Sequence, residues 1–231
     1  MFGIGRKNEN GFDIVVLQDA ASGTSVEIIP ACGAILHAFN VQYRGALLNI
    51  VEQYGSKKEF EEAAETGGFK SCKLSPFVCR MRNGHYHFGE QEYTIEKFYL
   101  GKHALHGLLY DASFDIVQLD ANTERAFAEL VYTYKVTDKG YPFRYDCRVM
   151  YELQKDAALT ITTVIKNHES NAIPVSDGWH PYFTFGGPVD ELLLSIPCNE
   201  MLEFDSELLP TGKYLPFSAF KTPKPIGDIS L

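Results

Sequence analysis

The 231-residue sequence has no long apolar run and no amino-terminal apolar segment. No stretch approaches the roughly 18 consecutive apolar residues that cross a bilayer as a helix. The basic pair Arg6-Lys7 near the start is not followed by the apolar region that a secretory signal needs. We therefore expect no membrane partner and a cytoplasmic location.

Clustered positive charge is also absent. Lysine and arginine total 21 and aspartate and glutamate total 30, which gives a formal net charge of −9. The densest charge run, residues 57–65, is mostly acidic. Because binding to a polyanion needs grouped Lys and Arg side chains, the composition argues against a nucleic-acid partner.

Cysteines are few, odd in number and scattered. None of the five has the C-x-x-C spacing of a zinc or redox site. We expect reduced, mostly buried thiols, as in the cytoplasm. The five are Cys32, Cys72, Cys79, Cys147 and Cys198.

The sequence is instead rich in residues that build a sheet. Hydrophobic residues are 45% and aromatic residues 13% of the chain, so it has enough apolar side chains for a sizeable core. Alternating apolar and polar positions predict a mainly β fold, a single large antiparallel β-sandwich domain over residues 1–231. Expected strands are Asp13–Gln18, Ser25–Ile29, Ala34–Asn40, Glu92–Phe98, Ala112–Ala121, Ala126–Val136, Phe143–Gln154, Leu159–Asn167, Glu191–Ser195 and Met201–Phe204.

Two local patterns refine this expectation. Between Asp111 and Asn167 strands alternate with turns such as Gln154-Lys155-Asp156, which predicts an antiparallel meander. The acidic run Lys57–Glu65 surrounds Phe60 and two alanines, and predicts one short solvated helix.

Two of the seven histidines lie in unusual surroundings. His106 is followed directly by Gly107, which allows close approach of a backbone or a ligand. His180 lies beside the chain's only tryptophan, Trp179, in an aromatic run that suits stacking on a sugar ring. Arg80 and Arg82 could bind hydroxyls or carboxylates, or could form a plain surface pair.

The other histidines raise the question of a metal. His85 and His87 share one face of a strand, and His103 and His106 are three residues apart, which are spacings that metal sites use. No Cys, Asp or Glu completes a ligand set at a matching spacing. We therefore expect no metal.

Four segments together resemble the aldose 1-epimerase (galactose mutarotase) family. An arginine is followed by a glycine and alternating aromatic positions, as in that family's first motif, and three further short motifs follow in the family's order. The matching residues are Arg80, Gly84, Tyr86, Phe88 and Tyr93, then Leu105-His106-Gly107, His180-Pro181-Tyr182-Phe183, and a turn at Leu208-Leu209-Pro210-Thr211-Gly212.

The resemblance implies a large antiparallel β-sandwich of the galactose mutarotase type. It also implies interconversion of the α and β anomers of an aldohexose such as galactose or glucose by acid/base ring opening, which requires no cofactor. By the same resemblance, His180 is the general acid for the ring oxygen, His106 binds and polarises near that oxygen, and Arg80 binds sugar hydroxyls. The ordinary imidazole pKa of about 6.5 suits the acid role.

The family's general base is a glutamate near the carboxyl terminus, and the sequence ends at Leu231 before that position. Glu203, Asp205 and Glu207 do not match the base. We therefore expect either a fragment of a longer protein or an inactive relative. The 231 residues alone should turn over substrate poorly, because a general base contributes about 10²–10⁴-fold.

Two other functions remain open. The first is a non-catalytic carbohydrate-binding relative that keeps Arg80 and the aromatic residues. The second is a hexose-phosphate epimerase, which needs a basic phosphate pocket to which Arg82, Lys102 and Lys73 could contribute.

Overall fold

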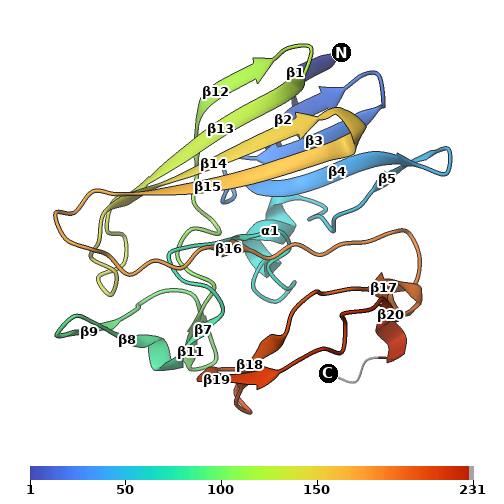
Figure 1. Cartoon of the computed structure of the whole chain (residues 1–231). Coiled ribbons are helices and arrows are strands. Elements are labelled where there is room, and N and C mark those ends of the chain that lie inside the picture. The colour runs from blue at the N-terminus through green and yellow to red at the C-terminus, as the bar shows by residue number, and fades with distance from the viewer. Residues whose placement is uncertain (229–231) are drawn as a thin grey trace. The chain divides into compact units, whose positions relative to one another are not determined.

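A computed structural model describes residues 1–228 of the chain. The chain divides into two compact units, Met1–Phe183 and Thr184–Leu231, which are described separately (Figure 1). The expectation of one domain over residues 1–231 stays a prediction. Within the described residues, no helix has the length and apolar character needed to cross a membrane.

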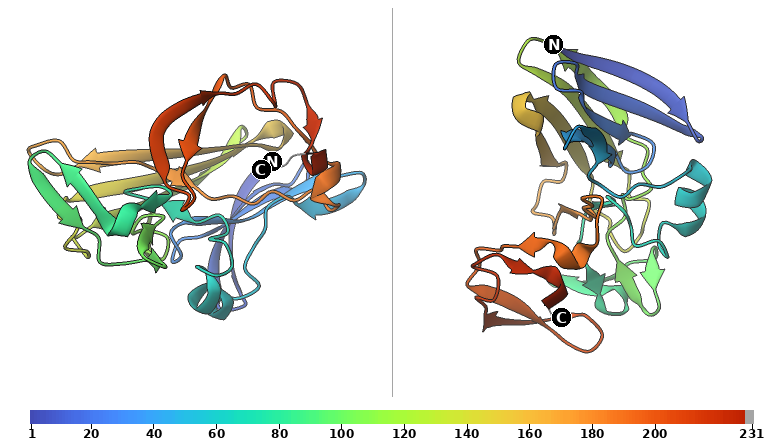
Figure 2. Two further views of the ribbon diagram at one scale, coloured as in Figure 1. Left: turned by 90° about the horizontal axis from the view of Figure 1, so that it is seen from below. Right: turned by 90° about the vertical axis from the view of Figure 1, so that its right-hand side faces the viewer.

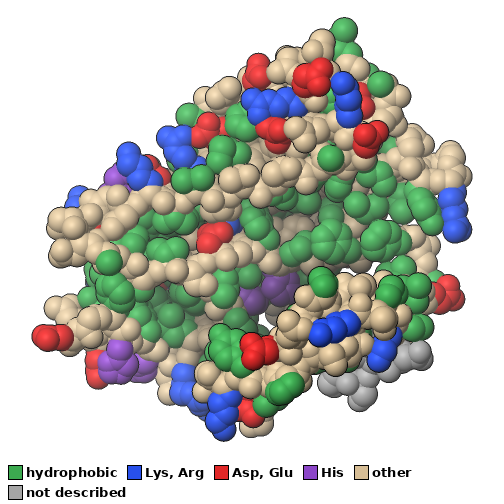
Figure 3. All heavy atoms as spheres, viewed as in Figure 1, with side chains coloured by type: hydrophobic (Ala, Val, Ile, Leu, Met, Phe, Trp, Pro, Cys, Tyr) green, Lys and Arg blue, Asp and Glu red, His purple; other side chains and the backbone are tan. Residues whose placement is uncertain are grey.

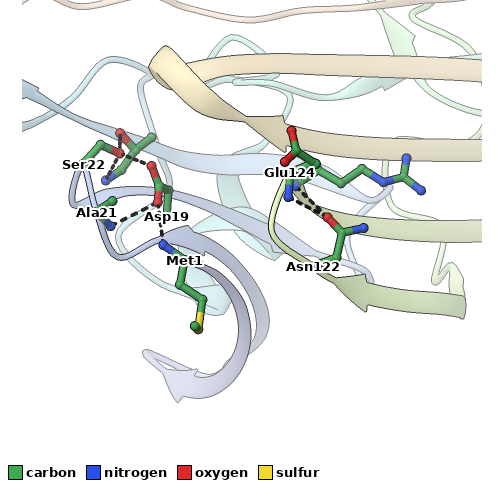
Figure 4. Close-up of polar contacts among 8 residues, drawn as sticks. Met1, Asp19, Ala21, Ser22, Asn122 and Glu124 are labelled. Atoms are coloured by element: carbon green, nitrogen blue, oxygen red, sulfur yellow. Dashed lines mark hydrogen bonds and ion pairs between the residues drawn. The ribbon is translucent and has the colours of Figure 1, made fainter.

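One layer of the first unit is a five-stranded antiparallel sheet in sequential order. Its first hairpins are held by a polar cluster at the sheet's end (Figure 4). There the Asp19 carboxylate accepts hydrogen bonds from the Ser22 hydroxyl at 2.8 Å and the Ala21 amide at 3.0 Å. The strands are β1 (Phe2–Glu9), β2 (Phe12–Asp19), β3 (Thr24–Ile29), β4 (Ile35–Tyr43) and β5 (Ala46–Asn49).

The other layer is the predicted meander, a four-stranded antiparallel sheet. Alternate residues of its third strand are buried from Tyr145 to Leu153, because successive side chains point to opposite faces. Lys, Arg, Asp and Glu side chains are intermixed over the outer face of this sheet (Figure 3). One of the ion pairs of this sheet joins Arg148 and Glu129. The strands are β12 (Asp115–Ala121), β13 (Arg125–Tyr134), β14 (Tyr145–Gln154) and β15 (Ala158–Asn167).

A shared apolar core joins the two sheets into a sandwich. Leu17 and Val26 of the first sheet belong to one buried cluster with Leu130 and Val149 of the second. The two sheets are seen as layers in Figures 1 and 2. The mainly β, antiparallel sandwich expected from the alternation is confirmed.

Short elements beside the two sheets carry the candidate site. Strand β7 (Arg80–Met81) pairs with β11 (His103–Leu105), which also pairs with β10 (Tyr99–Leu100). Strand β6 (Lys73–Leu74) pairs with β16 (Gly178–Trp179). Further elements are the hairpin of β8 (His85–Phe88) and β9 (Gln91–Thr94), and the 3-10 turns η1 (Arg82–Gly84) and η2 (Lys155–Ala157).

The strand expected over Glu92–Phe98 is wrong beyond Thr94. Asp138 is buried, and its Oδ2 accepts hydrogen bonds from the backbone amides of Glu96 at 2.9 Å and Lys97 at 3.0 Å. Those amides are therefore not available to a neighbouring strand. Residues 112–114, expected in a strand, precede β12, and the Ala112 amide donates within the turn to Leu109.

The predicted helix is confirmed as α1 (Lys57–Ala63), two residues shorter than expected. Ser56 caps it by accepting the Glu59 amide at 3.1 Å, and the Glu59 carboxylate accepts the Gly55 amide at 2.7 Å. This arrangement is similar to a capping box, with the glutamate bonding the amide that precedes the N-cap residue. Phe60 is the buried residue that attaches the helix to the core.

The second unit contains two short antiparallel pairs, built around buried Leu209 and Phe220. The turn expected over Leu208–Gly212 is misplaced, because Pro210 already begins a strand. The turn comes earlier, where the Asp205 carboxylate accepts the Leu209 amide at 3.0 Å. The elements are β17 (Leu193–Leu194), β18 (Glu200–Phe204), β19 (Pro210–Pro216), β20 (Lys224–Pro225), η3 (Val189–Glu191) and η4 (Ile226–Asp228).

Candidate functional site

Arg80 and His106 start from neighbouring backbone positions. Strands β7 and β11 are antiparallel, with Arg80 opposite Leu105. One residue further along, the His106 amide donates to the carbonyl of Cys79 at 3.0 Å. Two motifs that are 26 positions apart in the sequence therefore meet in one small sheet.

The backbone at His106 has an uncommon conformation. Its φ is +61°, in the left-handed region, and Gly107 follows with φ +83°. A Cβ at position 107 would lie 2.3 Å from the Ser75 carbonyl oxygen, which accepts the Leu108 amide at 2.7 Å. Only glycine fits there. Such strained residues persist where the surrounding structure fixes them, and they concentrate at functional sites.

His180 reaches the same region through another strand pairing. Trp179 of β16 lies opposite Lys73 of β6. The next residue continues this ladder, because the His180 amide donates to Cys72 at 3.1 Å and its carbonyl accepts the Ser71 amide at 2.9 Å. His180 is thus held by its backbone on both sides.

The two imidazoles are in direct contact. The ring centroids of His106 and His180 are 4.9 Å apart, with an angle of 62° between the planes. The buried Phe69 ring packs edge-on against His106 at 4.8 Å, and Tyr182, which is 42% exposed, lies 5.3 Å from His180. Both histidines are half-buried, so the pair has an enclosed side against Phe69 and an open side towards Tyr182.

The electrostatics of the pair favour a neutral His106. Burial, followed by the charges of His180 and Arg80, lowers the pKa of His106 to about 4. At pH 7 this ring is therefore uncharged and offers one N–H donor and one acceptor. The positive charge of Arg80, which lies opposite Leu105 in the neighbouring strand, also disfavours a proton on the His106 ring.

The three residues expected at the site, Arg80, His106 and His180, are thus brought together from three separate segments. His85 and His87, considered above as metal ligands, make other contacts. On the exposed hairpin β8–β9, His85 contacts the Thr94 hydroxyl at 2.8 Å and His87 lies 3.8 Å from Glu92. Across residues 1–228, no group of three His, Cys, Asp or Glu residues is placed to hold a metal ion.

Lys73 is not a phosphate ligand, contrary to one of the alternatives above. Its side chain is fully buried and forms an ion pair with Asp177. That carboxylate neutralises the charge that a phosphate would need. One signal of this burial is visible in the sequence, since Lys73 stands between Cys72 and Leu74 in a segment that is otherwise free of charge from Ser71 to Cys79.

Two further residues of the site were not predicted from the sequence. Phe69 forms the enclosed wall behind His106, and Asp177 lies three residues before His180. Phe69 has no distinguishing motif around it. Asp177 could have been suspected, because it is the acidic residue nearest to the Trp-His-Pro-Tyr run.

Comparisons with known proteins identify the family of the chain and structures with the same fold. The sequence model of a family described as aldose 1-epimerase matches residues 13–230. An uncharacterised Escherichia coli protein, YihR, is 33% identical over 140 residues, which are 60% of this chain. The match spans only 44% of that relative's length.

Solved structures show the same fold at low sequence identity. A galactose mutarotase-like protein from Clostridium acetobutylicum has a TM-score of 0.79 at 19% identity and covers 93% of this chain and 65% of its own. A galactose 1-epimerase from Lactobacillus acidophilus also has a TM-score of 0.79 at 19% identity, over 99% of this chain and 68% of its own. A GalM/aldose epimerase homologue from C. elegans has a TM-score of 0.76 at 20% identity, over 98% and 66%.

Proposed function

The chain belongs to the aldose 1-epimerase family, and we propose that it interconverts the α and β anomers of an aldohexose such as galactose or glucose. The observation that carries this proposal is the contact between His106 and His180 at 4.9 Å beside Arg80. Two imidazoles and a guanidinium supply the donors and acceptors that a pyranose ring with its hydroxyls requires.

The reaction needs one proton to leave and one to arrive. The C1 hydroxyl loses its proton while the ring oxygen gains one, the C1–O5 bond opens, and the aldehyde rotates about C1–C2. Ring closure by the reverse proton transfers gives either anomer, with no change of oxidation state. We assign protonation of the ring oxygen to His180, because a positioned imidazole is an effective general acid near neutral pH.

His106 has a different task from His180. Its pKa of about 4 keeps the ring neutral at working pH. A neutral imidazole in this position donates one N–H to the sugar without carrying the proton that the reaction transfers. Two titratable groups in one site can in this way take separate roles, one in binding and one in proton transfer.

Arg80 and the aromatic rings fix the orientation of the sugar. The guanidinium presents several N–H donors in a rigid plane, which suits vicinal hydroxyls. Tyr182, half-exposed beside His180, offers an aromatic face to the C–H face of a pyranose.

We assign the role of general base to no residue between 1 and 228. Two acidic residues of the β18–β19 hairpin accept hydrogen bonds from within that hairpin. Glu203 accepts the Thr211 hydroxyl at 2.6 Å, and Asp205 accepts the amides of its turn. A carboxylate base contributed from elsewhere would act on the C1 hydroxyl.

Turnover is measured by polarimetry of freshly dissolved α-galactose and α-glucose with the intact protein. We expect His180→Asn to lower kcat by about 10²–10⁴-fold, the size of a general acid's contribution. His87→Asn, on the exposed β8–β9 hairpin, is the matched control and should leave kcat unchanged. Near-normal turnover in His180→Asn would refute the acid role.

A carbohydrate-binding protein without turnover is the second candidate, because the exposed Tyr182 ring beside His180 is a sugar-binding feature that needs no catalytic base. Titration of the same sugars separates the two. Both candidates predict that Arg80→Met weakens binding about 10–100-fold, as for a lost hydrogen bond to a charged donor. Saturable binding without anomer interconversion would select the second candidate.

We also propose that the protein works in the cytoplasm. All five cysteines are free, and Cys32, Cys72 and Cys147 are buried. Burial raises the pKa of each of these three thiols to about 12. They are therefore structural, unreactive thiols of the kind that a reducing compartment preserves.

A further inference from the structure

A buried lysine lies against β16, the strand that directly precedes His180. The Lys73 side chain is 0% exposed. Its ammonium forms an ion pair with the Asp177 carboxylate and donates to the Thr163 hydroxyl at 3.0 Å. It also lies 4.4 Å from the centre of the Trp179 ring and 3.4 Å from the Gly178 carbonyl.

These contacts all converge on the approach to His180. Asp177, Gly178 and Trp179 are the three residues that immediately precede His180, and the Lys73 ammonium contacts each of them. Cys72 is the residue before Lys73, and its backbone carbonyl accepts a hydrogen bond from the His180 amide at 3.1 Å. One side chain therefore fixes both the β16 strand and its partner strand β6.

The same ammonium ties this pair of strands to the sandwich. Thr163 belongs to β15, the last strand of the four-stranded sheet. Trp179 adds a second attachment, since its ring lies 6.3 Å from the fully buried Tyr151 of β14. The segment that precedes His180 is thus attached to the four-stranded sheet by two contacts, one through Thr163 and one through Tyr151.

Burying a charged group to hold two strands together costs desolvation free energy. Removing an ammonium and a carboxylate from water carries a large penalty, and an apolar pair of similar volume usually gives equal or greater stability. The ion pair contributes a fixed relative orientation of the groups that it joins. An ammonium with several fixed acceptors has one geometry, whereas an apolar contact tolerates sliding.

We propose that Lys73 and Asp177 are positioning residues that hold the His180 imidazole in its productive orientation. This inference rests on the proposed function of His180 as general acid. We do not assign Asp177 as the general base, because its Oδ1 is paired with Lys73 and its Oδ2 is buried without a hydrogen-bond partner among the described residues. Neither residue needs to touch the sugar.

The test separates positioning from stability with a charge-balanced double variant. Lys73→Met combined with Asp177→Asn removes both charges, so that no unpaired ion remains in the interior. We expect its melting temperature to stay within a few degrees of the wild type. We expect kcat to fall about 10²-fold, the effect of misplacing a catalytic group by about 1 Å, while KM for the hexose changes little.

Lys166→Met on the exposed side of β15 is the matched control and should leave all three quantities unchanged. The orientation of His180 is read separately from its side-chain NMR resonances, which should shift in the double variant and stay fixed in the control. If the double variant does not fold, Thr163→Val removes only the hydroxyl acceptor and should lower kcat several-fold.

Two outcomes overturn the inference. The first is a folded double variant with wild-type kcat and unmoved His180 resonances, and the second is a Thr163→Val variant with neither change. A wild-type protein that turns over no aldohexose would defeat the proposed function instead. In that case the NMR comparison still decides whether the ion pair positions His180.

Discussion

Acidification from pH 7 to pH 5 should destabilise the first unit through His106. In the unfolded chain an imidazole has a pKa of about 6.5, whereas burial beside His180 and Arg80 lowers the pKa of His106 to about 4 in the fold. The unfolded state therefore binds a proton between these two values that the folded state does not bind. Stability rises with pH across this window and is lost as pH falls from about 6.5 to about 4.

The size of this effect follows from the two pKa values. For a fully enclosed group, a pKa of about 6.5 in the unfolded state and about 4 in the folded state lowers the free energy of unfolding by about 2 kcal/mol between pH 7 and pH 5. Because the ring is only half-buried, solvent screening reduces the expected loss to about 1 kcal/mol. His37, whose pKa is also lowered by burial, adds a loss of the same sign.

Urea denaturation followed by the fluorescence of Trp179, the chain's single tryptophan, measures this loss. His106→Asn is the variant of choice, because asparagine does not titrate and tolerates a left-handed φ. The carboxyl pKa values of Asp146 and Glu169 are lowered from 3.8 and 4.5, so the stability that these two groups contribute is lost mainly below pH 5. We expect the loss between pH 7 and pH 5 to shrink by about 1 kcal/mol in the variant, and an unchanged pH dependence would refute the reasoning.

Two further substitutions test the supports of the fold around the site. Gly107→Ala should cost about 2–4 kcal/mol in free energy of unfolding, because its Cβ would collide with the Ser75 backbone at 2.3 Å and φ is positive. Gly101→Ala, also at positive φ but with nothing within 4 Å, isolates the backbone part and should cost about 1 kcal/mol; equal losses in the two variants would contradict the steric argument. Asp138→Asn should cost about 2–4 kcal/mol, because the buried carboxylate accepts four hydrogen bonds from three backbone amides and an amide group cannot replace both of its oxygens. Asp156→Asn in the exposed η2 turn is its control, and denaturant unfolding that shows the same loss at both positions would rule out a special role for Asp138.

The long strands were predictable because their side chains alternate between core and solvent. Residues 145–153 of β14 carry this signal clearly, and the expected strand differs from the observed one by only two residues at its start. The prediction failed where a distant side chain decides the backbone. Asp138 ends β9 by binding amides more than 40 positions away in the sequence, and no local pattern reveals that.

The candidate site was only partly predictable, for a similar reason. Strands β6, β7 and β16 have two residues each, which is too short for periodicity to detect. His106 and His180 were identified by their neighbours in the sequence and by family resemblance, whereas their contact depends on these short pairings. The burial of Lys73 depends on Asp177, which lies 104 residues away, so its charge looked available when it is not.

The central claim is that Arg80, His106 and His180 bind one sugar together. The most direct measurement is an NMR titration of the protein with galactose, monitoring the side-chain resonances of these three residues and of His87. We predict that the first three shift with a single dissociation constant while His87 does not move. Shifts confined to other residues, or different constants for Arg80 and the two histidines, would contradict the account.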